Sequence, residues 1–327
     1  MARRPAASGL PTPARSGRRA SATIKSVRRL ATSLAVVGAL AAQSTAPTLV
    51  QFTPRVIAAL EDEDIAESSG VAASLANSGI YWTHNDSGDA PVLFAFDRQG
   101  RSHGRWTVTG ARNVDWEDIA LGPGPRGGGA YLYIADIGDN DMARREVTVY
   151  RVEEPAVGAA GTCASHCATK AAEAFQMEYP DGPHNAESLI VHPKTGDIYI
   201  VSKANAADPA TTVYAARANQ LGANKIRLAA IARLALPDRL TLALAGGITG
   251  GTVSADGRRV ALCDNLHYYE ATLPGGDGFD QIWKQPFYSR LLGVVGQIEG
   301  IDYRADGKAL ILTGEGKPAA VLEIPLE

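Results

Sequence analysis

A glutamate recurs along this chain at the start of short apolar, strand-like runs, where its carboxylate could do chemistry. The position is occupied by Glu67, Glu117, Glu187, Thr249 and Glu299, at intervals of about 50 to 70 residues. Strand alternation does not require a carboxylate there, because a packed interior prefers Val or Ile. If the five runs meet around one axis, four carboxylates converge. They then repel one another unless a proton or a cation lies among them.

A second set of polar residues follows the next strand-like run of each repeat. These residues are Asn85 and Asp86, Asp136, Asp264 and Asn265, and Glu315, whereas Lys203 takes this place in the third repeat. Hard oxygen ligands suit Ca²⁺ or Mg²⁺ rather than zinc or copper. We therefore expect Ca²⁺ or Mg²⁺ to be held by residues of the two sets, namely Glu67, Glu117, Glu187, Glu299, Asn85, Asp136 and Asp264. Alternatively, the carboxylates cap strand backbones, pair with Lys203 or an arginine, or hold channel water.

The elements that must position these residues have the pattern of β-propeller blades. Each repeat begins with two apolar runs, joined in three cases by the hairpin sequences KTGD, ADGR and ADGK, and further strand-like runs follow. Four strands in a repeat of about 50 residues are typical of a propeller blade. We predict an all-β fold, a β-propeller with five four-stranded antiparallel blades. Six blades are the less favoured count, and an antiparallel sandwich is a further alternative.

Individual segments of this propeller carry their own predictions. The fifth repeat is one strand short, and residues 48–58 could supply that strand and close the ring. A strand is expected at residues 281–288 in the fourth repeat. Residues 161–170 are expected to form a small polar loop in which Cys163 and Cys167 could form a disulfide, leaving Cys263 unpaired and buried. The Ala-rich residues 168–178 and 216–236 also allow helices.

Charge divides the chain into a basic first segment and an acidic body. Residues 1–42 contain eight basic and no acidic residues, and the remaining 24 basic and 35 acidic residues give residues 43–327 a net charge of −11. An acidic body repels phosphates, so we expect no nucleic-acid partner. No run of 18 apolar residues exists, so we expect no membrane span in the mature protein. We expect a monomer that acts on a small-molecule substrate or an unknown extracellular ligand.

The apolar run at residues 30–42, directly after the basic segment, is typical of an export signal. It contains Ala39-Leu40-Ala41, a small-residue pattern suited to cleavage. We predict a signal peptide or basic export segment at residues 1–42 and a single propeller domain at residues 43–327. The protein would be secreted, or reside in the periplasm or cell envelope, by Sec- or Tat-type export. The alternatives are a disordered basic tail or an uncleaved anchor.

Three classes of function fit a carboxylate-lined channel. The first is a metal-dependent hydrolase of a lactone, ester or phosphoester, in which Glu117 or His84 would take up a proton. The second is a non-catalytic secreted binding or scaffold propeller with a structural ion. The third is a glycosidase with a pair of carboxylates. Fold alone does not choose among these classes, and the hydrolase is the favoured hypothesis.

Three short motifs resemble those of the calcium-dependent β-propellers. They are DWEDIAL at residues 115–121, AESLIVHP at 186–193 and IEGIDY at 298–303. That group includes gluconolactonase and senescence marker protein, paraoxonase, and the phytase-like (esterase-like) propellers. The resemblance implies a calcium site held by a first-blade glutamate, which Glu67 matches, and by Asn and Asp residues, which Asp264 and Asn265 match loosely. Thr249 and Lys203 depart from a ring made only of ligands.

Overall fold

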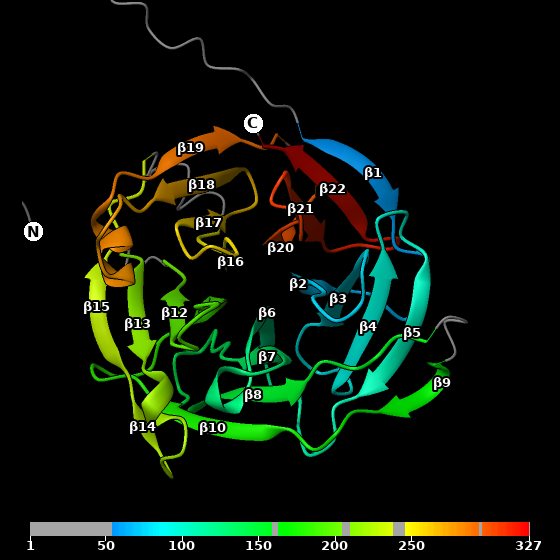
Figure 1. Cartoon of the computed structure of the whole chain (residues 1–327), viewed down its shortest axis with the longest axis horizontal. Helices are drawn as coiled ribbons and strands as arrows, with labels where there is room; N and C mark the ends of the chain where they lie inside the picture. The colour runs from blue at the N-terminus through cyan, green and yellow to red at the C-terminus, as the bar shows by residue number, and fades with distance from the viewer. Residues whose placement is uncertain (1–53, 159–162, 205–209, 238–245, 294–295, 327) are drawn as a thin grey trace, which may run out of the picture. The chain divides into compact units, whose positions relative to one another are not determined.

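The computed structural model describes residues 54–158, 163–204, 210–237, 246–293 and 296–326. The chain divides into two units, Met1–Val50 and Gln51–Glu327. The first unit, with the predicted export segment, lies outside the described residues, so the prediction for residues 1–42 stays a prediction. The second unit is a β-propeller of five blades, which confirms the predicted fold class and excludes the six-bladed and sandwich alternatives. Figure 1 shows its five sheets arranged around a central axis.

Each blade is a sheet whose first strand lies nearest the axis. The first blade contains β2 (Ser68–Ala73), β3 (Ile80–Asn85), β4 (Val92–Asp97) and β5 (Ser102–Thr107). The second contains β6 (Trp116–Pro123), β7 (Ala130–Asp136), β8 (Val147–Glu153) and β10 (Glu173–Glu178). The third contains β11 (Ala186–Val191), β12 (Ile198–Ser202), β13 (Thr212–Ala216) and β15 (Ala229–Arg233). Neighbouring strands within these four-strand sets are antiparallel.

The last two blades complete and close the ring. The fourth contains β16 (Gly250–Val253), β17 (Arg259–Cys263), β18 (His267–Thr272) and β19 (Tyr288–Leu291). The fifth contains β20 (Ile298–Tyr303), β21 (Ala309–Gly314) and β22 (Ala320–Pro325), with β1 (Arg55–Ala59) as its outermost strand. β1 pairs antiparallel with β22, from Arg55 opposite Glu323 to Ala59 opposite Ala320. The predicted closure by an amino-terminal strand is confirmed for its described part, and it covers the β22 edge.

The three predicted hairpins are present, and each places a glycine where the chain reverses. Gly196, Gly257 and Gly307 have φ values of 74°, 75° and 68°, a conformation that glycine adopts without a Cβ penalty. They connect β11 to β12, β16 to β17 and β20 to β21. The first two strands of the third, fourth and fifth blades are therefore set by local turn chemistry.

Two predicted segments differ in the structure. Residues 281–284 belong to a 3₁₀ helix, η3 (Phe279–Lys284), residues 285–287 are irregular, and the strand β19 begins only at Tyr288. Pro286 lacks the N–H that a strand would use, and Ile282 and Trp283 of η3 are buried in the core. The predicted polar loop at residues 161–170 contains β9 (Cys163–Ala168), which extends the first blade by pairing parallel to β5.

The Ala-rich segments are strands and not extended helices. Residues 168–178 contain β10, and residues 216–236 contain β15 and the short β14 (Ile226–Arg227), which pairs parallel to β10. The other short 3₁₀ helices are η1 (Pro125–Gly127) and η2 (Ala218–Gln220). No helix of the described residues is long and apolar enough to cross a membrane.

The cysteines behave largely as expected. Cys167 is disulfide-bonded, in agreement with the predicted local disulfide, although the side chain of Cys163 lies outside the described residues. Cys263 is a buried free thiol on β17, as predicted.

Small residues pack the innermost strands closely around the axis. A Cβ on Gly300 would lie 2.6 Å from the carbonyl carbon of Gly70, and a Cβ on Gly251 would lie 2.3 Å from the Ser188 Oγ atom. These distances leave no room for a side chain, so the inner strands pack closely against one another at both glycines. The inner strands therefore form a packed centre, and their two ends present separate surfaces.

Candidate functional site

Three of the recurring glutamates are the extra residues of β-bulges. In β6 the pairing passes from Trp116 opposite Asp136 to Asp118 opposite Ala135, which leaves Glu117 without a partner. The same irregularity leaves out Glu187 in β11 and Glu299 in β20. A bulge re-aims the side chain of its extra residue. The repeated glutamate is thus built into the start of the inner strand in the second, third and fifth blades.

The other two of the five recurring positions, Glu67 and Thr249, are not bulge residues. Glu67 precedes β2, forms an isolated bridge with Glu315 and is exposed. Thr249 precedes β16, and its hydroxyl donates a 2.6 Å hydrogen bond to the Ile298 carbonyl oxygen. The predicted convergence of the five positions therefore produces three buried carboxylates. Glu117, Glu187 and Glu299 are only 5%, 5% and 8% exposed.

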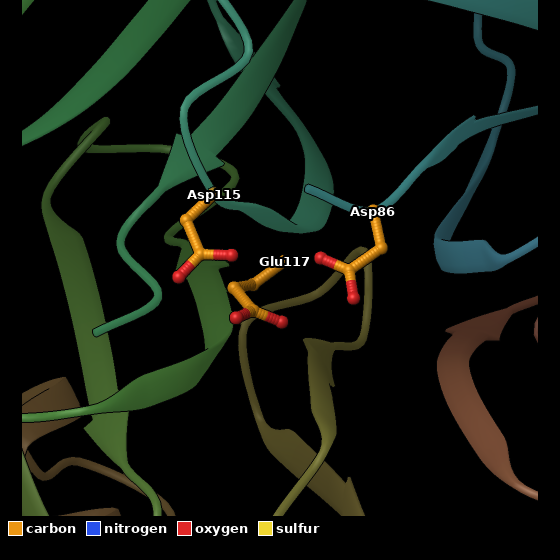
Figure 2. Close-up of side chains that lie close together, drawn as sticks. All are labelled: Asp86, Asp115 and Glu117. Carbon is orange, nitrogen blue, oxygen red and sulfur yellow. The ribbon is translucent and has the colours of Figure 1, made fainter. Parts of the chain in front are cut away.

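Glu117 belongs to a cluster with two aspartates. Asp86, Asp115 and Glu117 each offer one carboxylate oxygen, and these oxygens lie within 4.8 Å of one another. Figure 2 shows the three carboxylates facing a common space. Asp86 follows β3 of the first blade, Asp115 directly precedes β6, and Glu117 lies in β6 of the second blade. We name Asp86, Asp115 and Glu117 the three-carboxylate cluster.

Hydrogen bonds from neighbouring loops hold the cluster in place. The Asn113 side-chain amide donates to the Asp86 carbonyl oxygen at 2.7 Å and so ties the first blade to the second. The Asp136 carboxylate accepts from the backbone N–H groups of Val114 and Asp115, both at 3.2 Å. Arg144 donates to Asp136 at 2.7 Å. Asp136 thus orients the loop that carries Asp115.

The next residue along β6, Asp118, anchors this strand to other blades. Asp118 is fully buried and accepts hydrogen bonds from the backbone N–H groups of Leu189 at 2.8 Å and Gly251 at 3.3 Å. These bonds link the second blade to the third and fourth. Fixing Asp118 in this way limits the movement available to Glu117.

Gly138 forms one wall of the cluster. A Cβ at this position would lie 2.1 Å from the Glu117 Oε1 atom and 2.5 Å from the Asp115 Cγ atom. Real Cβ atoms are not found this close to another heavy atom, so only glycine leaves room for both carboxylates. The N–H of Gly138 also donates to the Asp115 carbonyl oxygen at 3.2 Å.

A buried ion pair lies beside the cluster. The Lys203 ammonium lies 2.5 Å from each carboxylate oxygen of Glu187. Burial alone would lower the pKa of Lys203, but the charge and hydrogen bonds of Glu187 outweigh it and raise that pKa. Lys203 therefore carries a positive charge beside the three-carboxylate cluster.

Burial also raises the pKa values of the carboxyl groups of Asp115, Glu117 and Glu299. The pKa of Asp115 is raised to about 6 by burial and then by the negative charge of Asp86, against the opposing charge of Arg144. Burial and the charges of Glu187 and Asp86 raise the pKa of Glu117 well above its ordinary value. Burial and the charge of Glu187 raise the pKa of Glu299 to about 8. Each shift shows a carboxylate poorly compensated by its surroundings.

Three predicted metal ligands lie in other hydrogen-bonding arrangements. Asn85 accepts from the backbone N–H of Ala66 at 3.0 Å and donates to the Asp64 carbonyl oxygen at 2.7 Å. Asp136 holds the loop of Asp115, as described above. Asp264 accepts from the backbone N–H of His267 and from the Tyr269 hydroxyl, both at 2.6 Å. These side chains fasten loops at the ends of second strands, and we do not include them in the site.

His84, predicted as a proton acceptor, is fully buried on β3. Its Nδ1 atom lies 2.9 Å from the Asn85 carbonyl oxygen, and its ring packs edge-on against Trp116 at 5.3 Å between centroids. Burial lowers its pKa to about 4, so the ring is neutral at pH 7. A side chain with no exposed surface cannot touch a substrate without movement, and we leave His84 out of the site.

Asp86 and Asp115 were not among the predicted site residues, although the sequence held a signal for each. Asp115 lies two residues before Glu117 in the sequence DWEDIAL, and residues two apart in an extended chain point to the same side. Asp86 follows Asn85, and the two are adjacent candidates in the same loop. The choice between them depends on which side chain the backbone turns toward the axis.

Two cavities lie away from the three-carboxylate cluster. One, of about 410 Å³, lies at the opposite end of the inner strands, because its lining includes their last residues Ala73, Pro123, Val191, Val253 and Tyr303. Another, of about 420 Å³, lies in the first blade beside Asn85, Arg105 and Lys317. Neither lining contains Asp86, Asp115 or Glu117. We place the candidate site at the carboxylates because charge, burial and geometry coincide there.

Comparison with known proteins assigns no family to the chain. No model of a known protein family matches it, and no curated protein matches it. The structure shows the fold, a five-bladed β-propeller, and the resemblance to calcium-dependent propellers stays a prediction.

Proposed function

We propose that this protein binds a divalent cation, Ca²⁺ or Mg²⁺, at Asp86, Asp115 and Glu117. The observation that carries the proposal is the burial of the Glu117 carboxylate beside two other carboxylates. Its side chain is 5% exposed and faces two other carboxylates, and among the described residues no hydrogen bond to its carboxylate is found. A buried carboxylate without compensation is costly, and it must take up a proton or meet a cation.

The donor set fits a hard cation. All three groups are carboxylates, the ligands that Ca²⁺ and Mg²⁺ use in proteins. Asp86 and Asp115 are partly exposed, so the site is reached from solvent. Three protein carboxylates would leave positions of a six- to eight-coordinate ion for water or substrate. This favours a site that reacts over a closed structural site.

We further propose hydrolysis of a lactone, ester or phosphoester. A bound cation would supply Lewis acidity and a water of lowered pKa. Glu299 lies outside the three-carboxylate cluster, and its pKa of about 8 allows it to exchange a proton near neutral pH. A non-catalytic propeller with a structural ion is the second candidate, because the lining of neither described cavity includes a residue of the cluster.

Calorimetric titration of the chelator-treated full chain with Ca²⁺ and Mg²⁺ tests the cation site. The wild type should bind one ion. Glu117→Gln, which removes one charge at nearly constant shape, should weaken binding at least tenfold. Gly138→Ala should do the same by displacing Glu117 and Asp115.

Gly128→Ala is the matched control, because a Cβ at Gly128 meets nothing within 4 Å and its φ is −103°. It should bind as the wild type does. Equal affinity in the wild type, Glu117→Gln and Gly138→Ala would contradict the site, as would no binding by the wild type.

A substrate screen separates the hydrolase from the structural-ion protein. Aryl esters, lactones and aryl phosphoesters are incubated with the wild type in Ca²⁺, in Mg²⁺ and in chelator. The hydrolase proposal expects turnover that needs the cation and is lost in Glu117→Gln. Cation binding without turnover would favour the structural ion instead.

We also propose export of the protein, on the basis of residues 1–42 and their basic and apolar composition. Cell fractionation should find the processed chain outside the cytoplasm. Replacing the apolar residues 34–37 by lysine should keep the chain inside. Equal distribution of both forms would contradict the proposal.

A further inference from the structure

A cavity of about 410 Å³ lies at the end of the inner strands opposite the three-carboxylate cluster. All five blades line it, through the last residues of β2, β6, β11, β16 and β20. The cavity therefore lies across the propeller axis and not between two neighbouring blades. Its volume is within the range of about 300–1,000 Å³ that is typical of small-molecule sites.

The lining of this cavity combines an apolar wall with a few charged side chains. Inner-strand residues such as Ile119, Ile190 and Val253 form the apolar part. The charged side chains of the lining are those of Arg259, Arg304, Asp256, Asp302 and Asp306. An apolar wall with a small number of polar groups is the usual composition of a ligand pocket, in which the polar groups fix the orientation of the ligand.

Both arginines of the lining already have carboxylate partners. The Arg304 guanidinium donates to Asp306 at 2.8 and 2.7 Å and to Glu323 at 3.0 Å. The Arg259 guanidinium lies 3.7 Å from a carboxylate oxygen of Glu270. Among the described residues, no ion pair includes either of the two other aspartates of the lining. The cavity therefore carries an excess of negative charge.

Of these two aspartates, Asp302 lies where three blades meet. Its carboxylate accepts hydrogen bonds from the backbone N–H of Ala73 at the end of β2, at 2.7 Å, and from the Thr252 hydroxyl of β16. Asp302 itself belongs to β20, so these bonds place its carboxylate between the first, fourth and fifth blades. The other aspartate, Asp256, is an exposed turn residue that water can solvate. The donors around Asp302 are neutral, and they leave its charge without a counter-ion.

We propose that this cavity binds a small organic ammonium ion with an apolar body, whose ammonium group donates to Asp302. Asp302 is partly exposed, so a ligand in the cavity reaches it. The charge-assisted hydrogen bond compensates the carboxylate, while the apolar wall contacts the body of the ligand. A single carboxylate is too few for Ca²⁺ or Mg²⁺, which take about six or more oxygen ligands. The inference does not rest on the proposed function, because no residue of the three-carboxylate cluster lines this cavity.

The test is an NMR titration of the isotope-labelled full chain with three ligands that share a benzyl group: benzylammonium, benzyl alcohol and phenylacetate. The backbone N–H groups of Ala73 and Tyr303 donate to Asp302 and report on its surroundings. The titration is made at about pH 8, above the pKa of about 6 to which burial raises Asp302. Benzylammonium should shift both resonances and bind at least tenfold more tightly than benzyl alcohol. Phenylacetate should bind more weakly than either.

Three variants locate the binding site of benzylammonium. Asp302→Asn removes the charge at nearly constant shape, and it should weaken binding of benzylammonium at least tenfold. Asp277→Asn makes the same change at an exposed loop residue outside the lining, and it should bind as the wild type does. Glu117→Gln should also bind as the wild type does, which separates this cavity from the three-carboxylate cluster.

Equal affinities of the wild type for the three ligands would overturn the proposal. Equal binding of benzylammonium by the wild type and Asp302→Asn would also overturn it, as would loss of binding in Glu117→Gln. Because the ligand series and the two resonances are measured in the wild type, an Asp302→Asn chain that fails to fold leaves the test decisive. In that case, benzylammonium that leaves the Ala73 and Tyr303 resonances unchanged overturns the site.

Discussion

Raising the pH in the presence of a chelator should destabilise the protein between about pH 5 and pH 8. The reason is Glu299, whose pKa is raised by burial from 4.5 to about 8 in the folded chain. Between these two pH values the folded state holds a proton that the unfolded state has released. The free energy of unfolding therefore falls as the pH rises through this interval. Carboxylates with lowered pKa values would produce the opposite trend.

The size of the effect follows from the two pKa values. Each pH unit between them contributes about 1.4 kcal/mol, so the interval from 4.5 to about 8 corresponds to at most about 5 kcal/mol. Relaxation and water entry around the ionised group reduce this value, and we expect a loss of about 2–5 kcal/mol. Such a loss is a large fraction of the stability of a typical domain.

Urea unfolding followed by tryptophan fluorescence, at pH values from 5 to 9 in chelator, measures the effect. In Glu299→Gln, which mimics the protonated acid, the part of the loss due to Glu299 should disappear. The exposed Glu63 provides the control, and Glu63→Gln should follow the wild type. A free energy of unfolding that is constant or rises from pH 5 to pH 8, or an equal fall in Glu299→Gln, would refute the reasoning.

Two further predictions concern stability. Glu154→Ala should lower the free energy of unfolding by about 2–4 kcal/mol in urea unfolding, because the buried carboxylate accepts hydrogen bonds from the Trp82 indole at 2.8 Å and the Ala76 backbone at 3.0 Å. The neighbouring exposed Glu153 is the control, and an equal loss in Glu153→Ala would contradict this account. Deleting residues 55–59 removes β1 and opens the β22 edge, so light scattering should detect aggregation. A deletion variant that stays monomeric with an unchanged melting temperature would contradict the role of β1 in closing the propeller.

Much of the fold was predictable because short local sequence patterns mark each repeat. The glycine hairpins at KTGD, ADGR and ADGK and the apolar runs beside them mark the first two strands of three blades. The closing strand within residues 48–58 was predictable because the fifth repeat contains one strand fewer than the others. The strand predicted at residues 281–288 was wrong for its first part, because residues 281–284 form part of η3 and Pro286 has no N–H for strand pairing. The parallel strands β9 and β14 depend on contacts between blades.

The candidate site was predicted in part. The recurrence of Glu117, Glu187 and Glu299 followed from the repeat, but the bulges that re-aim their side chains depend on strand register. Asn85 and Asp86 have similar oxygen chemistry in the sequence. In the structure the Asn85 amide bonds to the segment before β2, at Ala66 and Asp64, whereas the Asp86 carboxylate faces Glu117.

The measurement that tests the central claim most directly is the melting temperature of the wild type and of Glu117→Gln in Ca²⁺, in Mg²⁺ and in chelator. An ion that binds only the folded chain, at about 100 times its dissociation constant, adds about 2.7 kcal/mol, or roughly 5–10 °C for a domain of this size. We predict a shift of this size for the wild type with at least one of the two ions, and a shift of about half this size or less in Glu117→Gln, whose binding is at least tenfold weaker. Identical melting of the wild type in all three conditions would contradict a cation site at Asp86, Asp115 and Glu117.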